Sequence, residues 1–152
     1  MEKSDVMDLE VVKNPQAVVD YASNVAKMLK DIVSKKAKPV MIKGKQFLEF
    51  QDWQTVARFY KVTVKVDWSK EIREKDLIIG YEARATAISK DGRELTSAES
   101  MCLRNEANWK DKELFQVRSM AQTRACAKAY RNVFSWVVVM ADYEPVAAEE
   151  MV

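Results

Sequence analysis

Four basic residues in the C-terminal third of the chain recur with a spacing that a helix would gather on one side. With Arg118 at zero on a helical projection, Arg124, Lys128 and Arg131 fall at about 240°, about 280° and about 220°. One helical turn advances about 5.4 Å, against roughly 6 to 7 Å between phosphates of an extended single strand. No acidic residue follows Glu113 within this segment. We therefore predict that these cations bind the phosphates of a nucleic acid, the alternative being a solvated helix face.

A second group joins basic residues to one tryptophan in segments that we predict to be turns, strands and a loop. An exposed aromatic ring beside a cation can hold the bases of a single strand without reading their sequence. The alternative for Trp109 is a ring folded back over the core. The predicted members of this group are Lys43, Lys45, Arg84, Arg104, Trp109 and Lys110.

A third pattern is faintly similar to the metal-binding carboxylates of restriction-type nucleases. Asp67 and Glu82 would hold Mg²⁺ there, and Arg84 would stand where those enzymes carry a lysine. Arginine does not deprotonate, and acidic and basic residues on the exposed face of a strand usually form cross-strand salt bridges. A nuclease is therefore kept as an alternative, and no catalytic residue is predicted.

The residue types that are missing exclude several kinds of chemistry. The chain of 152 residues has no histidine, which excludes Ser-His and Cys-His catalysis and His-containing zinc sites. Cys102 and Cys126 are too few for a structural metal site or a disulfide framework. The three glycines are too scattered to form a phosphate-binding loop. We expect no metal and no cofactor.

Charge is distributed unevenly along the chain. The net charge is +2, but residues 1–10 carry −3, residues 142–152 carry −4, and the part between them carries +9. This pattern is typical of a protein that meets a polyanion, although a solubilising surface is the alternative. We predict an acidic arm (residues 1–13), one domain (residues 14–141) and an acidic tail (residues 142–152) that competes for the basic surface or faces a protein partner.

The N-terminal half contains signals for a helix, a hairpin and a second helix. Asn14 and a following proline predict the start of an amphipathic helix that ends at about residue 36, with apolar residues from Val18 to Ile32 forming one stripe. Residues 38–50 predict a hairpin that turns at Gly44. Asp52 is predicted to cap a short helix that continues to residue 60.

Three extended segments and a long helix follow. Residues 61–68, with Trp68 on the inner face, and residues 77–89 alternate between apolar and polar side chains, and an Asp-Gly turn leads into residues 94–104. After a loop that exposes Trp109, a helix capped by Asp111 is predicted, while residues 135–141 fit a strand or a helical continuation. The result is an α+β fold in which an antiparallel hairpin and a three-stranded meander pack against a long C-terminal helix.

This order of elements resembles the single-strand annealing protein superfamily. The superfamily contains the phage annealases of the RecT, Red beta, Erf and Sak types and the eukaryotic recombination mediator that shares their core. The resemblance covers residues 38–141 and is carried by the helix at residues 115–134, the Asp-Gly hairpin before it, and residues 44–62.

The resemblance implies a β-β-β-α core and a ring or filament of identical subunits, with single-stranded DNA in a basic groove beside a protruding hairpin. The backbone contacts it implies are Arg118, Arg124, Lys128 and Arg131, with Lys43, Lys45 and Arg84 on the outer lip. It further implies ATP-independent strand annealing in homologous recombination or phage DNA repair. The alternative outside nucleic-acid chemistry is an assembly module that uses the N-terminal helix.

Length and hydropathy limit the location of the protein. No apolar run approaches the roughly 18 residues that a membrane span needs, and the first ten residues are acidic, unlike a signal peptide. We expect a soluble protein in the cytoplasm of a bacterial, archaeal or virus-infected cell.

Overall fold

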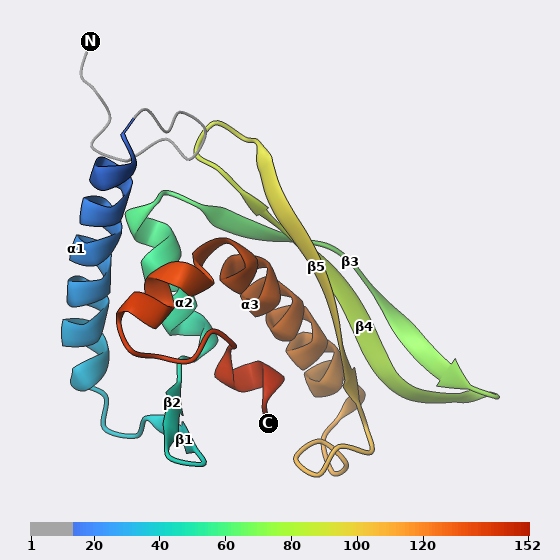
Figure 1. Cartoon of the computed structure of the whole chain (residues 1–152). Coiled ribbons are helices and arrows are strands. Elements are labelled where there is room, and N and C mark those ends of the chain that lie inside the picture. The colour runs from blue at the N-terminus through green and yellow to red at the C-terminus, as the bar shows by residue number, and fades with distance from the viewer. Residues whose placement is uncertain (1–13) are drawn as a thin grey trace.

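The computed structural model describes residues 14–152, and these form the α+β fold that the sequence predicts. Three helices lie side by side on one face of a three-stranded antiparallel sheet (Figure 1). The helix nearest the sheet, α3 (Leu114–Met140), packs directly against that face. The predicted acidic arm lies outside the described residues. No helix in the described part has the length and apolar character needed to cross a membrane.

The first helix, α1 (Pro15–Ser34), begins as predicted. The side chain of Asn14 accepts a hydrogen bond from the Gln16 N–H at 3.0 Å, and a proline occupies the first turn. The predicted apolar stripe is buried through its middle turns, but it ends on Val33, while Ile32 is exposed.

The small hairpin also follows the prediction. Strands β1 (Val40–Ile42) and β2 (Lys45–Phe47) pair antiparallel across a two-residue turn. Both turn residues, Lys43 and Gly44, have positive φ angles of 51° and 78°. Two positive φ angles match the right-handed twist of the flanking strands, which is why a glycine marks this turn.

The second helix, α2 (Phe50–Phe59), begins before the predicted cap. Glu49 is the N-cap residue, and Asp52 lies inside the first turn, where its Oδ2 accepts a hydrogen bond from the Glu49 N–H at 3.0 Å. The prediction of Asp52 as the cap was therefore wrong. Asp52 fills the position of the second partner in a capping box, which also uses an acidic or amide side chain.

The meander consists of β3 (Thr63–Glu74), β4 (Leu77–Ile88) and β5 (Glu94–Leu103), paired antiparallel in that order. The hairpin of β3 and β4 extends beyond the end of α3 (Figure 1). The helix packs closely on the sheet because the facing side chains are small and fully buried. They are Ala83, Ala85 and Ala87 of β4 and Ala121, Ala125 and Ala129 of α3.

A β-bulge at Asp67 interrupts β3 and overturns one prediction. The register shifts between Val66 and Trp68, so Trp68 pairs with Arg84 on the face away from α3 instead of entering the core. The Nζ of Lys70 lies 4.5 Å from the centre of the Trp68 ring there. One extra residue reverses the alternation of every side chain after it, which a strict period of two cannot anticipate.

The long helix α3 begins two residues later than predicted and includes the segment left open. Its N-cap residue is Glu113 instead of Asp111, and the Glu113 N–H donates to the Gln116 side chain at 3.0 Å. Residues 135–141 prove to be the last turns of this helix and its C-cap. A chain reversal then brings the short helix η1 (Ala148–Glu150) back onto the core.

Candidate nucleic-acid interface

The basic residues predicted on α3 separate onto two sides of the helix. Arg124, Lys128 and Arg131 lie on the side next to β5 and the C-terminal segment, which we call the β5 edge. Arg118 lies on the opposite side, next to β3, which we call the β3 edge. The two edges differ in what surrounds the cations.

Arg124 is buried, with 6% of its surface exposed, and all its donor groups are used inside the fold. Its Nη1 and Nη2 donate to Glu106 Oε2 and Oε1 at 3.1 and 2.8 Å. Further bonds reach the backbone carbonyls of Met101, Glu149 and Val152 at 3.0, 2.6 and 2.6 Å. Arg124 was predicted to contact phosphates, but a guanidinium with these partners has no donor left for a phosphate.

Glu106 is the counter-charge that sequence analysis missed. Burial alone would raise the pKa of its carboxyl, but hydrogen bonds from Arg124 and from the Leu103 N–H, together with the charge of Arg124, hold this pKa below its usual value. The acid stands 18 positions before its partner, in the loop that leads into α3. Because this counter-charge lies outside the helix, the sequence of α3 alone shows basic residues without acidic partners.

The acidic tail supplies the other counter-charges of the β5 edge. Arg131 Nε donates to both oxygens of Glu150 at 3.0 and 2.8 Å. Lys45, on the small hairpin, lies 3.8 Å from Glu144. Lys128 donates to the carbonyl oxygen of Glu99 at 3.2 Å. Three residues predicted to meet a polyanion thus meet carboxylates or carbonyls of their own chain.

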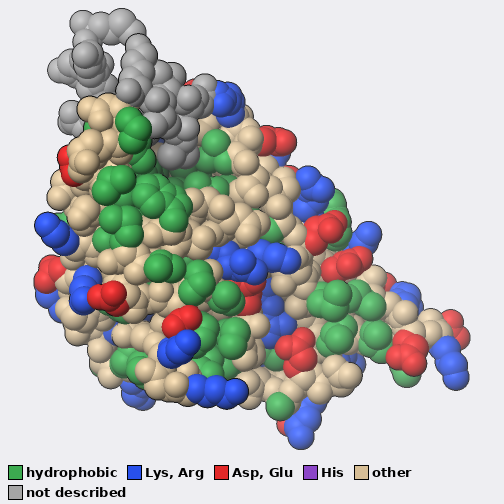
Figure 2. Space-filling model, in the orientation of Figure 1, with side chains coloured by type: hydrophobic (Ala, Val, Ile, Leu, Met, Phe, Trp, Pro, Cys, Tyr) green, Lys and Arg blue, Asp and Glu red, His purple; other side chains and the backbone are tan. Residues whose placement is uncertain are grey.

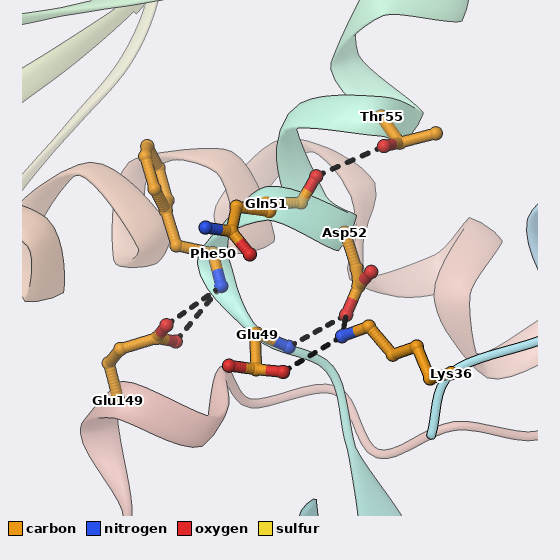
Figure 3. Close-up of polar contacts among 7 residues, drawn as sticks. All are labelled: Lys36, Glu49, Phe50, Gln51, Asp52, Thr55 and Glu149. Atoms are coloured by element: carbon orange, nitrogen blue, oxygen red, sulfur yellow. Dashed lines mark hydrogen bonds and ion pairs between the residues drawn. The ribbon is translucent and has the colours of Figure 1, made fainter. Parts of the chain in front are cut away.

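The tail also completes the N-terminus of α2 (Figure 3). The Phe50 N–H donates to both carboxylate oxygens of Glu149 at 3.0 and 2.9 Å. Burial raises the pKa of Glu149, outweighing the hydrogen bond from Phe50, which lowers it. Beside it, Lys36 Nζ bridges Glu49 and Asp52 at 2.9 and 2.5 Å. The tail is therefore integrated into the fold through its carboxylates and through the buried Ala147 and Ala148.

The β3 edge leaves its cation open. Arg118 is exposed, and its Nε donates to Ser69 Oγ at 2.9 Å, where Gln122 Nε2 also donates at 3.2 Å. The bulge at Asp67 turns Ser69 towards the helix, since Ser69 pairs with the buried Ala83. No carboxylate in the described part of the chain forms an ion pair with Arg118. The side chain is thus held through Nε by a neutral anchor, and its outer nitrogens remain available to an anion.

The aromatic member of the predicted site is not exposed as expected. Trp109 is half-buried against the core, and its indole N–H is buried without a hydrogen-bond partner among the described residues. The alternative interpretation, a loop ring folded back over the core, is the one that holds. Phe115, which the sequence analysis passed over, is instead exposed over 68% of its surface. Its place outside the alanine stripe of α3 was the available signal.

The remaining predicted residues lie at three separate places. Arg104 lines an open pocket of about 440 Å³ near the turn of the β3–β4 hairpin, together with Glu74 and Leu77, and Lys110 lies exposed in the loop that follows β5. Arg84 is on the far face of the sheet. Lys43 is exposed at the tip of the small hairpin. Only Arg104 and Lys110 belong to the segment that leads directly into the β3 edge.

On the far face of the sheet, the acidic residues considered for a nuclease are paired with cations. Asp67 Oδ2 lies 3.3 Å from Arg84 Nε and accepts a hydrogen bond from Thr86 at 2.5 Å. Glu82 lies 3.3 Å from Lys70. Across residues 14–152, histidine, cysteine and acidic side chains form no group of three or more that could hold a metal ion. The expectation of cross-strand salt bridges is confirmed.

On the face of the molecule shown in Figure 2, basic and acidic side chains are interspersed between apolar patches, without one continuous basic groove. Comparison with protein-family models, characterised proteins and solved structures finds no match.

Proposed function

We propose that this chain is a single-stranded DNA-binding protein that promotes annealing of complementary strands without ATP, in homologous recombination or phage DNA repair. The observation that carries the proposal is the arrangement of an antiparallel meander, with a projecting hairpin, against a long helix that presents an open arginine at the edge of the sheet. This is the order of elements that the resemblance to annealing proteins implies.

The proposed interface is smaller than the sequence predicted. It consists of Arg118, with Arg104 and Lys110 from the preceding loop, because these cations are exposed, belong to one stretch of the chain and have no carboxylate partner among the described residues. Cations on this surface would neutralise phosphates and hold a strand extended, which reduces the entropic cost of pairing with a second strand. Since three cations cover a short length of strand, we propose that several copies act together in a ring or filament.

The test is fluorescence anisotropy with labelled single-stranded and duplex oligonucleotides at two salt concentrations, with Mg²⁺ present and the products separated on a gel. We expect salt-sensitive binding that prefers the single strand, intact products, and faster annealing of complementary strands. Arg118→Ala should weaken binding to all sequences, while Lys27→Ala, which removes an exposed lysine of α1, should not.

Other results would point to the alternative functions. Absence of binding at low salt would refute the proposal and favour an assembly module that binds other proteins. Shortened products that depend on Mg²⁺ would favour a nuclease, and Glu82→Gln would then be expected to abolish cleavage.

A further inference from the structure

Phe115 is the most exposed aromatic side chain in the described part of the chain. It lies in the first turn of α3 and is absent from the set of residues that form or contact the core. The ring contacts within residues 14–152 join other aromatic side chains and leave this one uncovered. A single exposed apolar side chain is common, so the meaning of Phe115 depends on its neighbours.

The neighbour that gives Phe115 a role is Arg118. Residues three apart on a helix share a face, so the ring and the guanidinium lie side by side on the β3 edge. Arg118 is anchored to Ser69 through Nε, which leaves its outer nitrogens open. Thus a free aromatic face and a positioned cation adjoin on one short surface.

The loop that precedes α3 adds charges of both signs. Arg104, Lys110 and Lys112 are exposed cations, while Asp111 and Glu113 are exposed acids. The remaining acid of the loop, Glu106, is half-buried, and its ion pair with Arg124 neutralises its charge. Together with Arg118, the exposed charges of this loop are four cations and two acids, which leaves a net positive charge on the segment that carries Phe115.

We propose that Phe115 is a base-stacking platform for single-stranded DNA, with Arg118 binding the phosphate next to the stacked base. This inference rests on the proposed function and assigns the stacking role to a residue in place of Trp109. Every base has a flat π face, so stacking on Phe115 holds a strand without selecting its sequence. A paired base in a duplex is stacked on both sides, which gives the platform a preference for single strands.

The test compares two labelled strands of equal length and charge, an oligothymidine of about 30 nucleotides and an abasic strand of the same length. The wild-type protein should bind oligothymidine more tightly. Phe115→Leu, which keeps an apolar side chain but removes the ring, should weaken oligothymidine binding by roughly 5- to 150-fold and leave the abasic strand unaffected. Phe115→Tyr should retain wild-type affinity for both strands.

The control is Met41→Ala, which removes an exposed apolar side chain of β1. It should bind both strands like the wild type, and thermal melts should show all variants folded. Unchanged oligothymidine affinity in Phe115→Leu, while Arg118→Ala weakens both strands, would overturn the stacking role and leave the proposed function standing. An equal loss on both strands would also overturn it, in favour of a contact between protein subunits. No binding by the wild type to either strand would refute the proposed function and this inference together.

Discussion

The two edges of α3 carry the same kind of residue and use it in opposite ways. On the β5 edge, the Arg124 guanidinium is enclosed by Glu106, three backbone carbonyls and the C-terminal segment. On the β3 edge, the Arg118 guanidinium meets one serine and solvent. The difference does not lie in the helix. It comes from where the rest of the chain brings its carboxylates.

This comparison shows that a row of cations on a helix is weak grounds for a binding surface until its counter-charges are located. A buried arginine loses its hydration and regains hydrogen bonds from carboxylate and carbonyl partners. If the arginine is removed, those partners remain in the fold without a donor, which is destabilising. Removal of an exposed arginine that is held by a neutral group changes the free energy of unfolding only slightly. Substitutions on the β5 edge should therefore cost far more stability than substitutions on the β3 edge.

The largest effect is expected for Arg124→Ala. The change strands the Glu106 carboxylate beneath the loop and leaves backbone carbonyls of β5 and the tail without donors, so the free energy of unfolding should fall by about 3–5 kcal/mol. Denaturant titration followed by circular dichroism measures this loss. A loss below about 1 kcal/mol would mean that the network is dispensable, and the contrast between the edges would disappear.

A smaller loss is expected for Arg131→Ala, because its pair with Glu150 is only partly buried. The free energy of unfolding should fall by about 1–3 kcal/mol. The same titration applied to Glu150→Gln should give a comparable loss, and the double variant should lose less than the sum of the two. Additive losses would show that the two side chains do not interact in solution.

The two half-buried carboxylates Glu106 and Glu149 should respond to pH with opposite signs. Glu106 has a pKa below its ordinary value of 4.5 in the folded protein, so the stability that it contributes is complete above that value and is lost as the pH falls through the lowered pKa. The pKa of Glu149 is raised by burial above 4.5, so its favourable contribution is complete below 4.5 and is lost as the pH rises through the raised pKa.

Unfolding titrations between about pH 3 and pH 8 test this difference. Glu149→Gln should gain stability relative to the wild type as the pH rises through the raised pKa, and the gain should then level off. Glu106→Gln should show its largest deficit near neutral pH, and the deficit should shrink in acid. Parallel pH profiles of both variants and the wild type would contradict the assignment.

The smallest effect on stability is expected for Arg118→Ala. Its side chain is exposed and its single anchor is a serine, so the free energy of unfolding should change by no more than about 0.5 kcal/mol. On the proposed function, the same variant should weaken single-strand binding and lower the slope of log affinity against log salt by about one. A destabilisation as large as that of Arg124→Ala would show that the β3 edge is structural too.

The elements that the sequence predicted correctly depend on local signals. Asn14 caps α1 through a bond to the second residue after it, and Gly44 allows the turn of the small hairpin with its own φ angle. The alternation in β4 and the alanine spacing in α3 likewise describe neighbours along one element. Such features can be predicted because the residues that cause them are adjacent in the chain.

The features that were missed depend on residues that are distant in sequence or on one inserted residue. Burial of Arg124 requires Glu106 and the tail, which no period along α3 reveals. The place of Trp68 follows from a single bulge at Asp67. Arg118 was among the predicted site residues, whereas the exposure of Phe115 and the burial of Arg124 became visible only in the fold.

The contact between Glu149 and the first turn of α2 has a consequence for how the protein is made. The Phe50 N–H finds its acceptor 99 positions further along the chain. A growing chain is released from the ribosome from its N-terminus onward, at about 5–20 residues per second, so this amide waits several seconds for its partner. Until then α2 and the basic side of α3 lack the segment that covers them. Closure of the fold around α2 therefore waits until Glu149 has been made, and a chain that lacks this segment would be left with an open core.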